Sequence, residues 1–302
     1  MGSDAPDGMR GTVVALFTSE EQDSVELVRG VGIPGATSTG NDRRQVSLVA
    51  LEAIEAYGLA PAPRSLGEHL RTRGIDLAAL VEGRRLRLGS TAVVQLTERS
   101  QMAGIAPCVI ARVLRSGVVA RGDSIATDAA LDRPRFAVVT VSDRGAAGSR
   151  PDESGPIAAS ILRDALGAEP LAIDGLPDDA GLLERRLIAL ADDEICDLIV
   201  TTGGTGLAPR DVTPEATLAV IDREVPGIAE AIRAAGLAKT PFAMLSRAVC
   251  GQRGATLIVN LSGSPKAVRE QLAVLLPVLP HVLLIASGVP QSCAGPATHA
   301  PR

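Results

Sequence analysis

Ile199-Val200-Thr201-Thr202-Gly203-Gly204-Thr205-Gly206, followed by Arg210-Asp211-Val212-Thr213-Pro214, is the stretch that decides the fold of the second half of this chain. It begins within a short apolar run, residues 198–200, of the kind that forms a buried parallel strand. The run ends in threonines and three glycines, which let the backbone turn sharply and let a ligand approach its amides. Thr213-Pro214 then predicts a helix start, with threonine as N-cap and proline at the first helical position. A strand, a glycine-rich loop and a helix N-terminus together predict an anion-binding site.

Asp211 lies beside this predicted anion site. A second negative charge there is unfavourable unless the carboxylate holds a metal ion or a proton. The combination predicts phosphate chemistry assisted by a divalent cation.

Composition limits the classes of protein that this chain can belong to. Its 302 residues favour two domains, and the net charge of −5 with 1% aromatic residues argues against a nucleic-acid or anionic-membrane partner. The four cysteines lie far apart, without a CxxC pair, so neither a zinc site nor a disulfide framework is expected. No signal peptide is expected at the polar N-terminus, and prolines interrupt the apolar residues 272–286. We therefore expect a soluble, cytoplasmic protein.

The second half alternates strands and helices, which predicts a three-layer α/β domain with a mainly parallel sheet. Expected strands cover residues 136–141, 171–173, 198–200 and 256–260, and expected helices cover 156–166 and 179–191 and follow Pro214, Gly227 and Pro265. The apolar stripe of Leu272, Leu275, Leu276 and Leu279 is expected to be core.

Small, hydroxylated or acidic residues follow each of these strands. Since ligands of open α/β sheets bind outside the carboxyl ends of the strands, we expect these loops to share one pocket. Carboxylates there could hold magnesium and phosphate oxygens, an arrangement that suits nucleotidyl transfer. Three simpler interpretations remain open: the glycine loop as a tight turn without ligand, Asp178 as a helix cap, and Asp143 paired with Arg144 on a solvated surface.

The same residues carry a resemblance that covers about residues 134–285. The motifs are Val141-Ser142-Asp143-Arg144, Asp152 with Gly155, Pro177-Asp178, residues 201–206, Arg210-Asp211-Val212-Thr213-Pro214, Pro226-Gly227, Leu245-Ser246-Arg247 and Asn260-Leu261 with Gly263. They resemble the MogA/MoaB family, in particular the corresponding domains of gephyrin and the plant Cnx proteins. This resemblance implies adenylylation of molybdopterin by ATP with Mg²⁺, giving adenylyl-molybdopterin and pyrophosphate.

The resemblance also implies roles for individual residues. Asp178 and Asp211 match the two required aspartates and are the predicted catalytic and magnesium-binding residues. Predicted contacts with pterin phosphate and nucleotide are Ser142, Asp143, Thr202, Gly203, Gly204, Thr205, Gly206, Ser246, Asn260, Gly263 and Ser264. Ser262 stands where the family usually has proline. Proline would pre-set the turn, so serine is expected to leave this loop looser. A homotrimer formed by the second domain is a further implication.

The first half has many short apolar runs separated by glycines, which predicts a β-barrel-like module; residues 45–57 have helical spacing and predict an amphipathic helix. Residues 44–48, 67–70, 74–77 and 111–123 resemble a MOSC domain, a class associated with handling of the molybdenum cofactor and with sulfur carried on cysteine. Ala36 and Ser38 stand where that family usually has aspartate and histidine, and Cys108 abuts the closing strand instead of lying well upstream. Cys108 is therefore expected to be a buried apolar residue, with sulfur transfer as the alternative.

The predicted organisation is a MOSC-like domain over residues 11–128, a MogA/MoaB-like domain over 134–288 and a disordered tail over 289–302, with a short polar join near Ala130. The competing function is a non-catalytic carrier of molybdopterin or of the finished cofactor.

Overall fold

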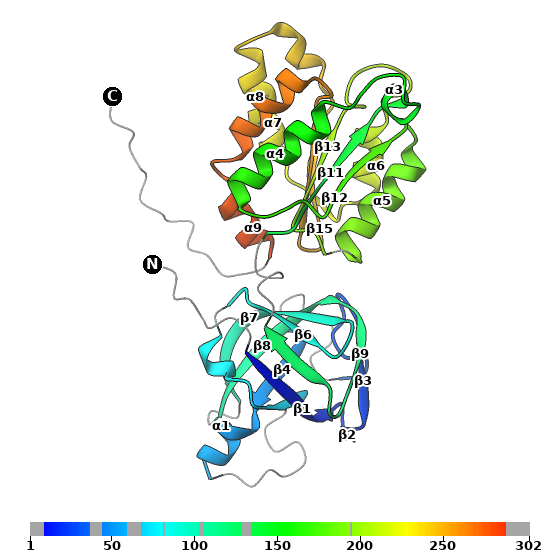
Figure 1. Cartoon of the computed structure of the whole chain (residues 1–302). Coiled ribbons are helices and arrows are strands. Elements are labelled where there is room, and N and C mark those ends of the chain that lie inside the picture. Colours follow the sequence, from blue (N-terminus) through cyan, green and yellow to red (C-terminus); the bar gives the residue numbers. More distant parts are fainter. Residues whose placement is uncertain are drawn as a thin grey trace, which may run out of the picture.

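The computed structural model describes residues 9–36, 44–58, 68–80, 82–102, 106–127, 134–193 and 195–287 of the chain. These residues form a barrel and an α/β unit (Figure 1). The predicted tail, the join near Ala130 and the departure at Ser38 lie outside the described residues.

The first unit is a closed β-barrel with a continuous apolar interior. Its main sheet has the order β10-β6-β7-β8-β4-β5-β1-β2, and pairing of β10 with β1 closes it. The strands are β1 (Arg10–Phe17), β2 (Glu21–Gln22), β3 (Ser24–Leu27), β4 (Val46–Ala50), β5 (Leu70–Arg73), β6 (Arg85–Leu88), β7 (Ala92–Met102), β8 (Ala106–Arg115), β9 (Gly117–Ala120) and β10 (Ser124–Thr127); β3 pairs with β9. A short helix, α1 (Leu51–Ala56), and a 3₁₀ turn, η1 (Leu77–Ala79), complete the unit. Closure leaves the main sheet without an open seam, and its interior side chains form one core.

The predicted helix over residues 45–57 is wrong in its first half. Val46–Ala50 is strand β4, which pairs with β8 on one side and β5 on the other, and only Leu51–Ala56 is helical. Apolar residues at spacings of three and four fit both patterns here, because a central strand buried on both faces needs no alternation. Two partner strands satisfied the backbone of Val46–Ala50 better than a short helix could.

The second unit has the predicted three layers around a six-stranded sheet of order β12-β11-β13-β16-β15-β14. Four strands run parallel: β12 (Ala172–Leu176), β11 (Phe136–Val141), β13 (Leu198–Thr202) and β16 (Thr256–Leu261). The edge strands β15 (Cys250–Arg253) and β14 (Arg223–Glu224) are antiparallel additions. This mainly parallel sheet matches the sequence prediction.

Alternate residues of each central strand point into two separate cores, which is why the strands read as continuous apolar runs. Leu198 and Val200 join one core with α4 (Ser154–Leu166), α7 (Pro226–Leu237), α8 (Pro265–Leu275) and α9 (Leu279–Ala286). Ile199 joins the other core with α5 (Ala180–Asp192) and α6 (Thr213–Val220). Figure 1 shows these two groups of helices on opposite sides of the sheet. The predicted core role of Leu272, Leu275 and Leu279 is confirmed, and Leu276 is partly buried and packs against the same core.

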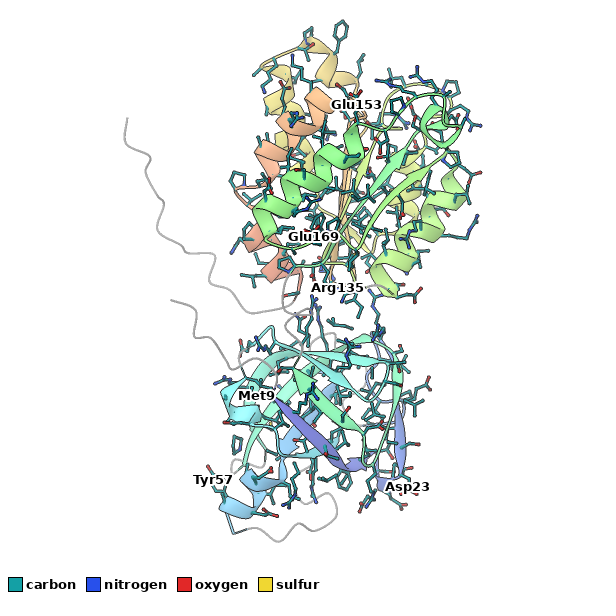
Figure 2. The ribbon with its side chains drawn as sticks, in the orientation of Figure 1. Met9, Asp23, Tyr57, Arg135, Glu153 and Glu169 are labelled. Atoms are coloured by element: carbon teal, nitrogen blue, oxygen red, sulfur yellow. The ribbon has the colours of Figure 1, made fainter. Side chains whose placement is uncertain are left out.

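Polar contacts join the two units at the amino ends of the parallel strands. Arg85 of the barrel forms a buried ion pair with Asp197, which also accepts from the backbone N–H of Arg135. Asp192, the last residue of α5, pairs with Arg29 of the barrel and with Arg253. Figure 2 shows Arg135 between the two units. The barrel therefore contacts the edge of the sheet opposite to the carboxyl ends of its strands.

Within the described residues no single helix is long and apolar enough to cross a membrane; α8 and α9 reach that length only together, across a bend of 68°.

Candidate functional site

Loops from the carboxyl ends of β11, β12, β13 and β16 enclose a cavity of about 660 Å³. Glu153 lies at its wall, and Figure 2 shows this residue at the end of the sheet remote from the barrel. The cavity brings together most of the predicted site residues, namely Ser142, Asp143, Asp178, Thr202, Gly203, Gly204, Thr205, Gly206, Asp211, Gly263 and Ser264.

The glycine loop after β13 has a shape that side chains would not allow. Gly203 has φ +94° and Gly204 has φ +61°, and a Cβ on Gly203 would lie 2.3 Å from the carbonyl oxygen of Val141. The first residue of α6 holds this shape, because Thr213 donates its hydroxyl to the Gly203 carbonyl (2.9 Å) and its N–H to the Gly204 carbonyl (3.1 Å). Thr213 is therefore the first helical residue and not the predicted N-cap, a position taken by Val212. Its hydroxyl ties the loop to the helix.

The loop presents backbone donors to the cavity. Among the residues that the structure describes, the N–H groups of Gly204, Thr205 and Gly206 donate to no protein acceptor. Buried or partly buried amides of this kind are normally paired, so an incoming anion would satisfy them.

A second donor group lies directly against the first. Gly263 precedes α8, and a Cβ placed on it would come within 3.1 Å of the Gly203 Cα atom. In the described part of the chain the N–H groups of Gly263 and Ser264 also have no protein acceptor, and they open the eleven-residue helix α8 at its positive end. Two neighbouring anion cradles therefore share the cavity.

Ser262 does not loosen the second loop. The Gln271 side chain of α8 accepts from the Ser262 N–H (2.9 Å) and donates to the Ser262 hydroxyl (2.9 Å). These two hydrogen bonds restrain the turn. A proline could form neither of them, because it lacks both the backbone N–H and the hydroxyl.

Asp178 and Asp143 bridge the loops after β12 and β11. The Asp143 N–H donates to the Asp178 carboxylate (2.8 Å), and the Asp178 N–H donates to the Asp143 carboxylate (3.0 Å). Arg210 donates twice to Asp143, each time at 2.8 Å, and this bond lowers the pKa of Asp143 and raises that of Arg210. Asp143 thus pairs with Arg210 and not with its neighbour Arg144. Asp179 caps α5 by accepting from the Leu182 N–H, so Asp178 is not the cap.

The two predicted catalytic carboxylates flank the glycine loop. Asp178 Oδ1 would lie 3.1 Å from a Cβ on Gly204, and Asp211 Oδ2 would lie 2.8 Å from a Cβ on Gly206. Asp211 also accepts from the Ala208 N–H at 2.9 Å, which folds the carboxylate back over its own loop. In the described ranges no group of three or more His, Cys, Asp or Glu residues is placed to hold a metal ion. Two carboxylates suit Mg²⁺ when phosphate and water complete its shell, so the donor set fits that ion.

Asn260 and Ser246 lie outside the cavity lining. Asn260 is 1% exposed, and its amide donates to the hydroxyls of Thr201 and Thr217 (both 2.9 Å) while its carbonyl oxygen accepts from the Val249 N–H (3.2 Å). These bonds tie β16 to β13 and α6 beneath the cavity. The arrangement supports the site from below, and direct ligand contact by Asn260 and Ser246 stays a prediction.

The structure gives Arg210 and Arg247 roles that the sequence did not assign. Arg210 and Arg247 belong to the motifs Arg210-Asp211-Val212-Thr213-Pro214 and Leu245-Ser246-Arg247, but a motif does not show which atoms its side chains contact. Arg210 bridges to the loop after β11, and Arg247 donates to carbonyls of the glycine loop.

Cys108 and His69 of the barrel are buried. Cys108 is 3% exposed, and burial raises the pKa of its thiol, in agreement with the expected apolar role. It borders a separate cavity of about 450 Å³ in the barrel. His69 is buried and hydrogen-bonded to Ser47.

The fold and the cavity define the class of this protein: an α/β protein with a cleft suited to phosphate groups at the carboxyl edge of a parallel sheet. Residues 137–281 match the family described as "Probable molybdopterin binding domain". The chain is 45% identical over 140 residues to the molybdopterin adenylyltransferase of Haemophilus influenzae, covering 46% of this chain and 71% of that protein. Identity to the Escherichia coli molybdopterin adenylyltransferase is 44% over 140 residues, covering 46% of this chain and 71% of that protein.

A solved structure is also similar. The molybdopterin biosynthesis enzyme MoaB of Thermus thermophilus shares 50% identity over 52% of this chain and 99% of its own, with a TM-score of 0.48. From the sequence matches, the chain belongs to the molybdopterin adenylyltransferase family of molybdenum cofactor biosynthesis. The family match falls within the second domain.

Proposed function

We propose that the second domain transfers the adenylyl group of ATP to the terminal phosphate of molybdopterin. An oxygen of the pterin phosphate attacks the α-phosphorus of ATP, the bond between the α-phosphorus and the bridging oxygen breaks, and pyrophosphate leaves. The observation that carries this proposal is the pair of adjacent amide cradles around Gly203 and Gly263, because the reaction must hold two phosphate-bearing substrates side by side.

The chain's own groups supply positioning and charge. The amides of residues 204–206 hold one substrate phosphate, and the Gly263 and Ser264 amides with the N-terminus of α8 hold the other. Asp178 and Asp211 would hold Mg²⁺, which when bound neutralises charge on the phosphate oxygens. Asp143 and Ser142 form the rim, where the ion pair with Arg210 links two of the loops.

The test is incubation of the purified full chain with molybdopterin, ATP and Mg²⁺, with chromatography of adenylyl-molybdopterin and pyrophosphate. Asp178→Asn and Asp211→Asn are expected to lower the rate by about 10²-fold or more, a typical loss for one electrostatic group of an active site. Asp174→Asn is the matched control, since Asp174 pairs with Arg186 outside the cavity. Absence of product, or an Asp211→Asn variant as fast as wild type, would refute the assignment. Tight pterin binding without ATP turnover would identify a carrier instead.

The remaining sequence predictions extend this proposal. The barrel, by its resemblance to MOSC domains, would handle the same cofactor without the usual aspartate and histidine, since Ala36 and Ser38 take their places. Sulfur transfer would require a reactive Cys108, which burial and a raised thiol pKa oppose. The homotrimer and the cytoplasmic location remain predictions, and sedimentation of the purified chain tests the first.

A further inference from the structure

Arg247 makes three contacts with the loop of residues 205–211 and one with helix α6, and it does not line the cavity itself. It lies in the segment between η2 (Pro241–Leu245) and β15. Its backbone N–H donates to the Thr205 carbonyl (3.0 Å), Nε donates to the Gly206 carbonyl (2.7 Å), and a terminal nitrogen donates to the Asp211 carbonyl (2.6 Å). The other terminal nitrogen forms an ion pair with Glu215 in the first turn of α6.

These contacts join the two ends of the segment that carries Asp211. Residues 206 and 211 bind the same planar guanidinium, so the distance and the angle between their peptide groups are fixed together. A lysine ammonium has no such rigid fork and could not hold both carbonyls at once in the same geometry.

The contacts also set the direction of an amide donor. In a planar trans peptide the C=O and N–H bonds point in opposite directions. Because the backbone N–H of Arg247 holds the Thr205 carbonyl, the N–H of Gly206 in the same peptide group points away from residue 247. This N–H is one of the three glycine-loop donors without a protein acceptor among the described residues.

We propose that the Arg247 side chain is a positioning group, which fixes the Gly206 carbonyl and the backbone of Asp211 for adenylyl transfer. The backbone N–H of residue 247, which orients the Gly206 donor, is kept in every side-chain variant. The proposal rests on the proposed function of the site. Glu215 in turn orients the guanidinium, but its carboxylate side chain is 55% exposed, so the ion pair contributes less than the carbonyl contacts do.

The experiment measures kcat and KM for Arg247→Ala and Arg247→Lys in the full chain. Loss of loop geometry is expected to lower kcat by about 10- to 100-fold, on the scale of a misplacement of about 1 Å, with a smaller change in KM for ATP. Added guanidinium ion at millimolar concentration is expected to restore part of kcat in Arg247→Ala, and Glu215→Gln is expected to stay within a few-fold of wild type. Arg233→Ala is the matched control, since Arg233 donates to the Ala248 carbonyl and not to the loop.

Rescue by guanidinium distinguishes positioning from stability, because millimolar guanidinium is far too dilute to change the folding equilibrium and would not restore a variant that merely unfolds. Unchanged kcat in Arg247→Ala, or a loss equal to that of Arg233→Ala, would overturn the proposal while leaving the adenylyl transfer in place. If Arg247→Ala does not fold, Arg247→Lys decides: a wild-type kcat in that variant overturns the proposal. Absence of turnover in the wild-type chain would overturn both proposals.

Discussion

Replacing Gly203 by alanine perturbs the loop that holds both cradles together. The residue has φ +94°, a conformation that costs an L-residue roughly 1–2 kcal/mol. The added Cβ would also lie 2.3 Å from the Val141 carbonyl oxygen, a backbone atom that has no rotamer to change. Forcing such an overlap in a packed region costs about 1–3 kcal/mol more, so we expect a total destabilisation of roughly 2–5 kcal/mol.

The activity is expected to fall further than the stability alone implies. Relief of the overlap requires a shift of about 1 Å, and a misplacement of that size costs about 10²-fold in rate. Because Gly203 also abuts Gly263, the shift would separate the two cradles.

Gly167→Ala is the matched control. Gly167 has φ +61° at the C-cap of α4, but a Cβ there would meet nothing within 4 Å. It should therefore show only the conformational cost of roughly 1–2 kcal/mol and keep full activity. The assays are urea unfolding followed by far-UV circular dichroism, and adenylylation at saturating ATP. If Gly203→Ala unfolds no earlier than Gly167→Ala and turns over at the wild-type rate, the steric reasoning is wrong.

Three further predictions follow from burial and charge. Burial raises the pKa of the Cys250 thiol to about 12, so iodoacetamide should alkylate this residue only in the unfolded chain, and labelling of the folded protein would contradict this. The pKa of Asp143 lies below its ordinary value of 3.8 because Arg210 binds the carboxylate. The ion pair should therefore be fully formed above pH 3.8 and be lost as the pH falls through the lowered pKa. Arg210→Ala should raise the pKa of Asp143 in an NMR titration. Asp192→Asn leaves both Arg29 and Arg253 without their carboxylate partner and should lower the free energy of unfolding by about 1–2 kcal/mol, with an unchanged kcat. A loss of activity without a loss of stability would contradict this.

Local sequence patterns predicted the second domain well because its signals are mutually consistent. Continuous apolar runs such as residues 198–200 are buried between two helical layers, and a glycine or proline follows directly where β12, β13 and α4 end. The same reasoning failed for residues 46–50, where apolar spacing fitted a helix and two neighbouring strands decided otherwise. Helical spacing and a doubly buried strand cannot be distinguished over five residues without knowledge of the partners.

The sequence by itself determined the parallel α/β class of the second domain, the glycine loop after β13 and the loops that share its cavity. These features depend on local backbone preferences and on the rule that parallel strands end at one edge. Only the tertiary structure decided which side chains contact which atoms. Asn260 donates to Thr201 and Thr217, Asp143 pairs with Arg210, and Arg247 donates to the carbonyls of Gly206 and Asp211. Such pairings join residues far apart in the chain, and their geometry depends on how the elements pack, which no local pattern encodes.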